Sequence, residues 1–281
     1  MAATSTPLAA ATQPIGVFDS GIGGLTVVAA LRQLLPNESI IYLGDTARVP
    51  YGGKSATTVQ RYSLEIAQML VREGAKAIVI ACNTASAVAV PELEKNLSVP
   101  VTGVILPGAT AAIAATRSGR IGVIGTRATI KSGAYERALH SIAPDVHVLA
   151  RACPLLVPLI EEGWLESRIS DDVILQYLRP LLDEGIDTLV LGCTHYPLLR
   201  PAIARLVGPD ITLVDSAQNC ASAVQQLLTR KNLNALPQET GRLEVALTDP
   251  PDSFLEIARE ALGLEIGDVQ VREVSGAAPM R

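Results

Sequence analysis

Two cysteines occupy matching positions in the chain. Cys82 follows the aliphatic run IVIA and precedes Asn-Thr, whereas Cys193 follows LVLG and precedes Thr-His. Such short aliphatic runs are typical of buried parallel strands, and ligands of open α/β sheets bind beyond the carboxyl ends of those strands. A helix that begins beside a cysteine favours its thiolate through the helix dipole. We therefore expect both thiols to do chemistry, although a lone buried cysteine is often only a small apolar side chain.

The other two cysteines lack polar residues after them. Cys153 lies in ACPLLVP and Cys220 lies in a helical pattern, so both are interpreted as core residues. A structural zinc site needs four ligands, usually in paired short spacings, but the chain has three His and no CxxC. A redox pair between Cys82 and Cys193 stays as a minor alternative. The sequence predicts neither a metal nor a cofactor.

Two acid–base groups on opposite sides of a small molecule can invert a carbon centre. One thiolate removes the Cα proton from one face, and the other thiol returns a proton to the opposite face. The reverse reaction exchanges these roles. Because the Cα proton of an amino acid is very weakly acidic, donors in a water-excluded cleft must stabilise the carbanion. The thiol pKa values must also move from about 8.5 toward the working pH.

Other polar residues lie in turns. Asp19 and Ser20 begin DSGIGG, whose glycines let the backbone approach a ligand, although simple helix capping explains them too. This motif is not the G-x-G-x-x-G fingerprint of dinucleotide-binding proteins. The segments GDTARVPYGGK (44–54), ILPGATAA (105–112) and GTRATIKSG (125–133) are interpreted as loops. Glu161 ends an apolar segment, where a solvated loop is the simpler interpretation.

Strands and helices alternate along the chain. Short runs rich in Val, Ile and Leu predict strands, and amphipathic periods predict helices. This alternation is typical of α/β proteins with parallel sheets. The predicted strands are 15–19, 39–45, 76–82, 99–105, 119–125, 146–150, 187–193 and 211–215, and the predicted helices are 25–35, 57–73, 171–183 and 217–229.

A weak internal repeat divides this pattern in two. IGVFDS (15–20) resembles IGVIGT (121–126), and IVIACNT (78–84) resembles LVLGCTH (189–195). The cysteines follow at similar offsets in both halves. We therefore predict two pseudo-symmetric lobes, each a mainly parallel sheet flanked by helices, with the active site in the cleft between them.

Composition limits the function further. The 281 residues are 48% hydrophobic and carry a net charge of −5, so no basic surplus indicates binding to nucleic acid or to an anionic membrane. Four cysteines are too few for a disulfide scaffold and suggest reduced thiols. The start of the chain lacks the features of a signal peptide, and no stretch has the apolar length of a membrane span. We expect a cytoplasmic protein.

Five motifs resemble the glutamate racemases of the cofactor-independent aspartate/glutamate racemase superfamily. They are FDSGIGGLTV, GDTARVPYG, ACNTAS, LGCTHYPLL and VDSA, in this order between about residues 15 and 226. The resemblance implies an isomerase that interconverts L- and D-glutamate without a cofactor and supplies D-glutamate for peptidoglycan. It implies a small-molecule substrate, no nucleic-acid or membrane partner, and an assembly that could include a homodimer.

The resemblance also implies roles for individual residues. Cys82 would take the proton from D-glutamate and Cys193 from L-glutamate, with Asp19 and His195 as their respective acid–base helpers. Two further acidic residues match positions associated with catalysis, namely Asp45 and Glu161. The implied substrate contacts are Asp19, Ser20, Tyr51, Gly52, Asn83, Thr84, Thr126, Thr194 and His195.

In these relatives one lobe is discontinuous. The small residues and prolines at the start of the chain predict a flexible tail at 1–13, and the resemblance implies a first lobe from 14–102 plus 215–281 and a second lobe from 103–214. Residues 244–274 match no motif and are interpreted as a strand, a helix from Asp252 to Leu262 and a possible further strand. Three alternatives stay open: a racemase acting on aspartate, a thiol hydrolase that uses Cys193 with His195, and a two-lobed binding protein.

Overall fold

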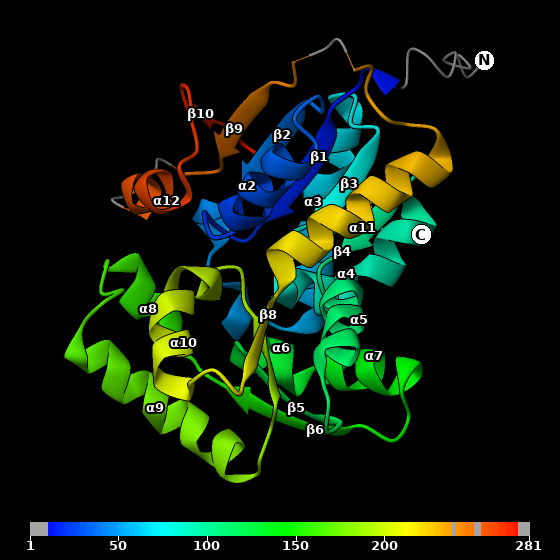
Figure 1. Cartoon of the computed structure of the whole chain (residues 1–281). Helices are drawn as coiled ribbons and strands as arrows, with labels where there is room; N and C mark the ends of the chain where they lie inside the picture. The colour runs from blue at the N-terminus through cyan, green and yellow to red at the C-terminus, as the bar shows by residue number, and fades with distance from the viewer. Residues whose placement is uncertain (1–10, 238–239, 250–253, 275–281) are drawn as a thin grey trace.

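The structure is a computed structural model and describes residues 11–237, 240–249 and 254–274. Within these ranges the strands form two separate sheets in which every pairing is parallel. The first sheet has the order β10-β9-β2-β1-β3-β4 and the second has the order β6-β5-β7-β8. Each sheet carries flanking helices (Figure 1), which confirms the predicted α/β class. We call the first sheet with its helices the first lobe, and the second sheet with its helices the second lobe.

Short aliphatic segments form the strands, as the sequence predicts. The first sheet is built from β1 (Ile15–Asp19), β2 (Ile40–Gly44), β3 (Ala77–Ile80), β4 (Val101–Gly103), β9 (Leu243–Leu247) and β10 (Gln270–Val271). The second sheet is built from β5 (Arg120–Gly125), β6 (His147–Ala152), β7 (Thr188–Gly192) and β8 (Thr212–Asp215). The inner strands β1, β3 and β7 are buried along their full length, which explains why their sequences do not alternate with polar residues.

The two sheets share a four-strand core. The order β2-β1-β3-β4 in the first lobe corresponds to β6-β5-β7-β8 in the second, while β9 and β10 extend only the first sheet. The repeated sequence motifs lie on corresponding strands, IGVFDS and IGVIGT on β1 and β5, and IVIACNT and LVLGCTH on β3 and β7. Cys82 and Cys193 consequently follow equivalent strands in the two lobes.

Helices connect these strands. Those that follow strands of the first sheet, or lie beside them, are α2 (Leu25–Leu34), α3 (Ala56–Arg72), α4 (Asn83–Asn96), α11 (Ser216–Lys231) and α12 (Phe254–Leu262). Those associated with the second sheet are α5 (Ile105–Ala115), α6 (Arg127–Lys131), α7 (Ala134–Ile142), α8 (Leu156–Glu161), α9 (Arg168–Asp183) and α10 (Arg200–Val207). In Figure 1, α11 runs along α2, and α12 lies at the outer side of α2.

Local capping defines several helix ends. The hydroxyl of Ser55 accepts a hydrogen bond from the backbone of α3, and the carboxylate of Asp215 does the same for α11. Gly74 and Gly185 adopt positive φ angles just after α3 and α9, as the sequence predicts for helix-ending glycines.

Two segments differ from the sequence prediction. Residues 105–112, interpreted as a loop, begin α5, and residues 127–131 form the short helix α6. Pro107 lies in the first turn of α5, where its missing N–H leaves no hydrogen bond unmade. Gly108 lies inside α5 where the Tyr135 side chain packs against it, with the hydroxyl 3.3 Å and the ring 3.4 Å from where a Cβ would be. The features that suggested a loop are therefore compatible with a helix.

The first and last of the described residues adjoin the first sheet. Of the predicted tail, residues 1–10 lie outside the described residues, and the buried Ala11 accepts a hydrogen bond from the Lys76 Nζ. The predicted strand, helix and strand of the C-terminal segment correspond to β9, α12 and β10, although Asp252 lies outside the described residues. Among the helices described, none combines the length and apolarity that crossing a membrane requires.

Candidate active site

The carboxyl ends of the strands in the two lobes meet across the molecule. The Thr84 hydroxyl, after β3, lies 2.9 Å from the Thr126 hydroxyl, after β5. The Thr26 hydroxyl, in α2, donates a hydrogen bond of 3.0 Å to the backbone oxygen of Thr194. These contacts join residues from different lobes. The polar turns that follow the strands therefore face one another, as the sequence predicts.

Cys82 lies in a buried polar turn of the first lobe. It occupies the N-cap position of α4, and its thiol lies 3.6 Å from the Ser20 hydroxyl. The neighbouring Asp19 is only 1% exposed, and its Oδ2 accepts hydrogen bonds from the Gly24 and Gly21 backbone N–H groups, at 3.0 and 3.3 Å. Asp19 and Cys82 interact directly through their side chains. Ser20, Asp19 and Cys82 thus form one cluster.

Burial controls the protonation of this cluster. Removal from water raises the pKa of Asp19, and the positive charge of His195 only partly offsets that effect. Burial and the charge of Asp19 also raise the pKa of Cys82, although the Ala85 backbone N–H at the start of α4 acts in the opposite direction. The start of α4 thus acts on this thiol in the direction that the sequence predicts, but burial and Asp19 outweigh it. Cys82 is held as a thiol.

Cys193 has a different partner. The Nδ1 atom of His195 lies 3.8 Å from its sulfur, and the His195 Nε2 lies 3.2 Å from the Oε1 of Glu161. Burial disfavours the imidazolium, but the contacts with Cys193 and Glu161 outweigh it and raise the pKa of His195 to about 10. Glu161 ends α8, and its side chain is 40% exposed. The sequence suggested only a solvated loop at this position, whereas in the structure Glu161 contacts His195.

The two thiol clusters influence each other. The charge of Cys193 raises the pKa of Cys82, and Asp19 and His195 interact electrostatically across the lobes. The structure therefore brings together Cys82, Asp19, Cys193 and His195. Each thiol has one ionisable helper beside it, a carboxyl group in the first lobe and an imidazole in the second.

Gly23 gives the imidazole its space. A Cβ atom on Gly23 would lie 2.5 Å from the ring of His195 and 2.7 Å from the Thr194 hydroxyl. Real Cβ atoms do not approach other atoms so closely, so only glycine permits this contact between the lobes. The sequence shows GIGG as a flexible turn but does not show which residue packs against it.

Amide and hydroxyl groups surround the thiols. Asn83 is 2% exposed, and its Oδ1 accepts a hydrogen bond of 2.7 Å from the Tyr135 hydroxyl in α7. Its Nδ2 lies 3.4 Å from the Ser216 hydroxyl. Tyr135 therefore orients the Asn83 amide from the other lobe. The sequence did not single out Tyr135, because its position in a helix is also typical of a core residue.

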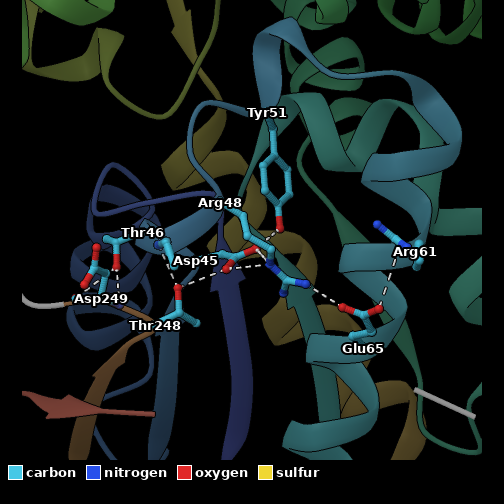
Figure 2. A network of polar contacts seen from close by, with 9 residues as sticks. Asp45, Thr46, Arg48, Tyr51, Arg61, Glu65, Thr248 and Asp249 are labelled. Atoms are coloured by element: carbon cyan, nitrogen blue, oxygen red, sulfur yellow. Dashed lines mark hydrogen bonds and ion pairs between the residues drawn. The ribbon is translucent and has the colours of Figure 1, made fainter. Parts of the chain in front are cut away.

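The loop after β2 closes one side of the site. Tyr51 is 1% exposed and interacts electrostatically with Cys82, and a Cβ on Gly52 would lie 3.1 Å from the Cβ of Thr126. The Tyr51 hydroxyl donates a hydrogen bond to the Asp45 carboxylate, which also binds Arg48 (Figure 2). Asp45 is thus joined to its own loop, whereas Asp19 and His195 are joined to the thiols.

A cavity of about 680 Å³ opens between the lobes beside Gly52 and Thr84. Among the described residues that line it, Lys54, Arg127, Lys131 and Arg137 are cationic and none carries a carboxylate. In the described part of the chain, no group of three or more His, Cys, Asp or Glu side chains is arranged to hold a metal ion. The arrangement can transfer protons from two sides of the cleft to a small anionic molecule.

Four similarities to known proteins bear on this site. The sequence model described as Asp/Glu/Hydantoin racemase matches residues 24–224. The glutamate racemase of Geobacter metallireducens is 51% identical over 91% of this chain and 94% of its own. The solved structure of a glutamate racemase isoform of Bacillus anthracis has a TM-score of 0.89 and 42% identity, covering 93% of this chain and 97% of that one. The glutamate racemase of Francisella tularensis, solved with D-glutamate, has a TM-score of 0.87 and 38% identity, covering 94% and 98% of the chains.

Proposed function

The chain belongs to the Asp/Glu/Hydantoin racemase family and is an isomerase, and we propose that it interconverts L- and D-glutamate by proton transfer between two cysteines. The observation that carries this proposal is the pair of buried thiols, Cys82 and Cys193, after equivalent strands of opposite lobes. The D-glutamate would supply peptidoglycan synthesis. The cytoplasmic location, a homodimer and lobe boundaries near 102 and 214 stay predictions.

The proton balance requires one thiol and one thiolate. From L-glutamate, the Cys193 thiolate takes the Cα proton, and the Cys82 thiol gives its proton to the opposite face of the carbanion. D-Glutamate leaves with Cys193 protonated and Cys82 as thiolate. The starting condition is restored when Cys193 loses a proton and Cys82 gains one, in exchange with solvent. The reaction from D-glutamate follows the same steps in reverse.

The environment of each thiol suits the start of the reaction from L-glutamate. Burial and Asp19 hold Cys82 protonated, as a proton donor must be. His195, whose pKa is raised to about 10, is a cation at neutral pH and lies beside Cys193 as a counter-charge for its thiolate. Asp19 and His195 are therefore proposed as acid–base helpers of the first and second thiol respectively, with Glu161 acting through His195.

The polar residues of the cleft are proposed to bind the substrate. The carboxylates would accept hydrogen bonds from Asn83, Thr84 and Thr194 and from the backbone at the start of α4. The amino group would meet Asp19 and Ser20. Tyr51, Gly52 and Thr126 would line the remaining wall. The cationic lining of the neighbouring cavity suits an anionic substrate such as glutamate.

Glutamate is favoured over the other candidates for specific reasons. A Francisella relative of 38% identity was solved with D-glutamate, whereas the aspartate racemase of Picrophilus torridus is 16% identical, with a TM-score of 0.54, and shares the fold alone. A thiol hydrolase with Cys193 as nucleophile has no use for the second thiol. A binding protein has no use for either thiol beside an ionisable helper.

Circular dichroism tests the proposal directly. The purified protein is incubated with L-glutamate or D-glutamate, with no cofactor added, and we expect the optical signal of either enantiomer to decay to zero. Cys82→Ala and Cys193→Ala should each abolish the decay. Cys153→Ala and Cys220→Ala are matched controls, because those cysteines are also buried and free, and they should retain most activity. Wild-type turnover in either of the first two variants would contradict the two-cysteine reaction.

A further inference from the structure

The carboxylate of Asp45 lies at the centre of a hydrogen-bonded network (Figure 2). Asp45 follows β2 and is completely buried. The Arg48 Nε lies 2.9 and 2.7 Å from its two oxygens, and the Tyr51 hydroxyl donates to Oδ2. The Thr248 hydroxyl donates to Oδ1 at 3.0 Å. Donors on both oxygens fix the carboxylate in one orientation.

Through Tyr51 this carboxylate determines the position of the loop that closes the site. Tyr51 begins a short 3₁₀ helix, Tyr51–Gly53, and Gly52 in that helix packs against Thr126 of the second lobe. The Thr126 hydroxyl lies 2.9 Å from that of Thr84. A displacement of Tyr51 would therefore be passed to the hydroxyl groups proposed to bind the substrate.

Thr248 reaches Asp45 from the C-terminal segment, which matched no sequence motif. It directly follows β9, and its backbone N–H donates a hydrogen bond of 3.0 Å to the Gly44 oxygen. Its hydroxyl accepts a hydrogen bond of 2.9 Å from the Ala47 N–H while donating to Asp45. One hydroxyl thus holds both the backbone of the loop and the carboxylate.

The neighbouring Thr46 provides a comparison within the same contact. Its hydroxyl donates a hydrogen bond of 3.0 Å to the Asp249 backbone oxygen and accepts one of 2.8 Å from the Asp249 N–H. Thr46 therefore ties the loop to the C-terminal segment as Thr248 does, but its hydroxyl bonds to backbone atoms of Asp249 rather than to the Asp45 carboxylate. Substituting each threonine in turn therefore distinguishes two effects, the attachment of the C-terminal segment to the loop and the orientation of Asp45.

We propose that Thr248 is a positioning residue for the reaction, which orients Asp45 and, through it, Tyr51 and the loop beside Thr126. This inference rests on the proposed racemisation of glutamate. It assigns Asp45 a positioning role instead of the catalytic role that the sequence resemblance implied, because its oxygens are bound by Arg48, Tyr51 and Thr248. It also gives the C-terminal segment a function in the site.

The test compares Thr248→Val, Thr248→Ser and Thr46→Val with the wild-type protein. Both kcat and KM are measured from each enantiomer, together with the Tm of every variant. Because misplacement of a binding group by about 1 Å can weaken a reaction by up to 10²-fold, Thr248→Val should lower kcat/KM about tenfold in both directions, mainly through KM. Thr248→Ser keeps the hydroxyl and should restore kcat/KM to within about twofold of wild type, and Thr46→Val should stay in the same range.

Three results would overturn the inference: wild-type kcat/KM in Thr248→Val, an equal loss in Thr248→Ser, or an equal loss in Thr46→Val. Should Thr248→Val fail to fold, Thr248→Ala removes the same hydroxyl with a smaller side chain and is judged by the same criteria. A wild-type protein that racemises neither enantiomer would instead contradict the proposed function, and the inference with it.

Discussion

The Nε2 atom of His195 lies 3.2 Å from the Oε1 atom of Glu161, which joins the imidazole beside the second thiol to a carboxylate at the end of α8. This contact helps to raise the pKa of His195 to about 10. Glu161→Gln should therefore lower the pKa of His195, because the neutral amide stabilises the imidazolium less. A titration of the His195 ring followed by NMR measures the change. Glu162→Gln, an exposed neighbour, is the control and should leave the titration unaltered.

The same shift has a consequence for stability. The pKa of His195 is about 10 in the folded protein and 6.5 when unperturbed, so the folded state holds a proton that the unfolded state releases between these values. The resulting stabilisation is complete below pH 6.5 and disappears as the pH rises through 10. Urea denaturation measures the free energy of unfolding of the wild type and of Glu161→Gln. The difference between them should shrink as the pH rises across this window. A constant difference would mean that Glu161 acts on stability independently of the imidazolium.

The helper of each thiol should influence the two directions of reaction unequally. Asp19 is joined to Cys82 and His195 to Cys193, and acid–base assistance contributes roughly 10²–10⁴-fold at the step that it serves. Asp19→Asn and His195→Asn should then show opposite asymmetries in kcat for L- and D-glutamate. Because the enantiomers are equally stable, kcat/KM must stay equal in both directions, so KM compensates. Equal proportional losses of kcat in both variants and in both directions would contradict the assignment of one helper to each face of the Cα atom.

Gly23 should tolerate no side chain. In Gly23→Ala the new methyl group would lie 2.5 Å from the His195 ring, so either the imidazole or the lobes must move. Such a displacement of the imidazole or of the lobes should lower kcat/KM by at least about tenfold. Gly21→Ala is the matched control in the same turn, because its Cβ would meet only the Val49 side chain at 3.6 Å, an ordinary contact. Equal activity of the two alanine variants would show that the packing against Gly23 is dispensable.

Local sequence patterns predicted the strands, the two lobes and the strand-end cysteines well. Each of these depends on residues close together in the chain, and the repeat pairs β1 with β5 and β3 with β7 in the two sheets. Contacts between distant segments could not be predicted in this way. Examples are the hydrogen bond from Tyr135 to Asn83 and the one from Thr248 to Asp45. The sequence around Tyr135 is typical of a core helix, and the sequence around Thr248 is typical of a turn. The loop expected at 105–112 was wrong because Pro107 and Gly108 are tolerated in α5 for positional reasons.

The buried ion pair between Lys76 and Glu38 should matter for stability. The Lys76 Nζ lies 2.5 Å from the Glu38 Oε2, with side chains 1% and 3% exposed, and also donates to the Ala11 oxygen. Lys76→Met would leave the carboxylate buried without this partner, which costs about 3–5 kcal/mol of unfolding free energy. Urea denaturation measures it, with the exposed Lys95→Met as control. The folded fraction of Lys76→Met should retain wild-type kcat, and an unchanged unfolding midpoint would contradict the prediction.

The central claim is that Cys82 and Cys193 act on opposite faces of the Cα atom. Proton NMR of L-glutamate in deuterium oxide at early reaction times tests it most directly. With two bases, the proton removed by Cys193 does not return to the same carbon, and the deuteron comes from Cys82. We therefore predict that newly formed D-glutamate carries deuterium at Cα while the remaining L-glutamate keeps its proton. D-Glutamate that retains the original proton, or L-glutamate that exchanges faster than product forms, would show a single base and contradict the account.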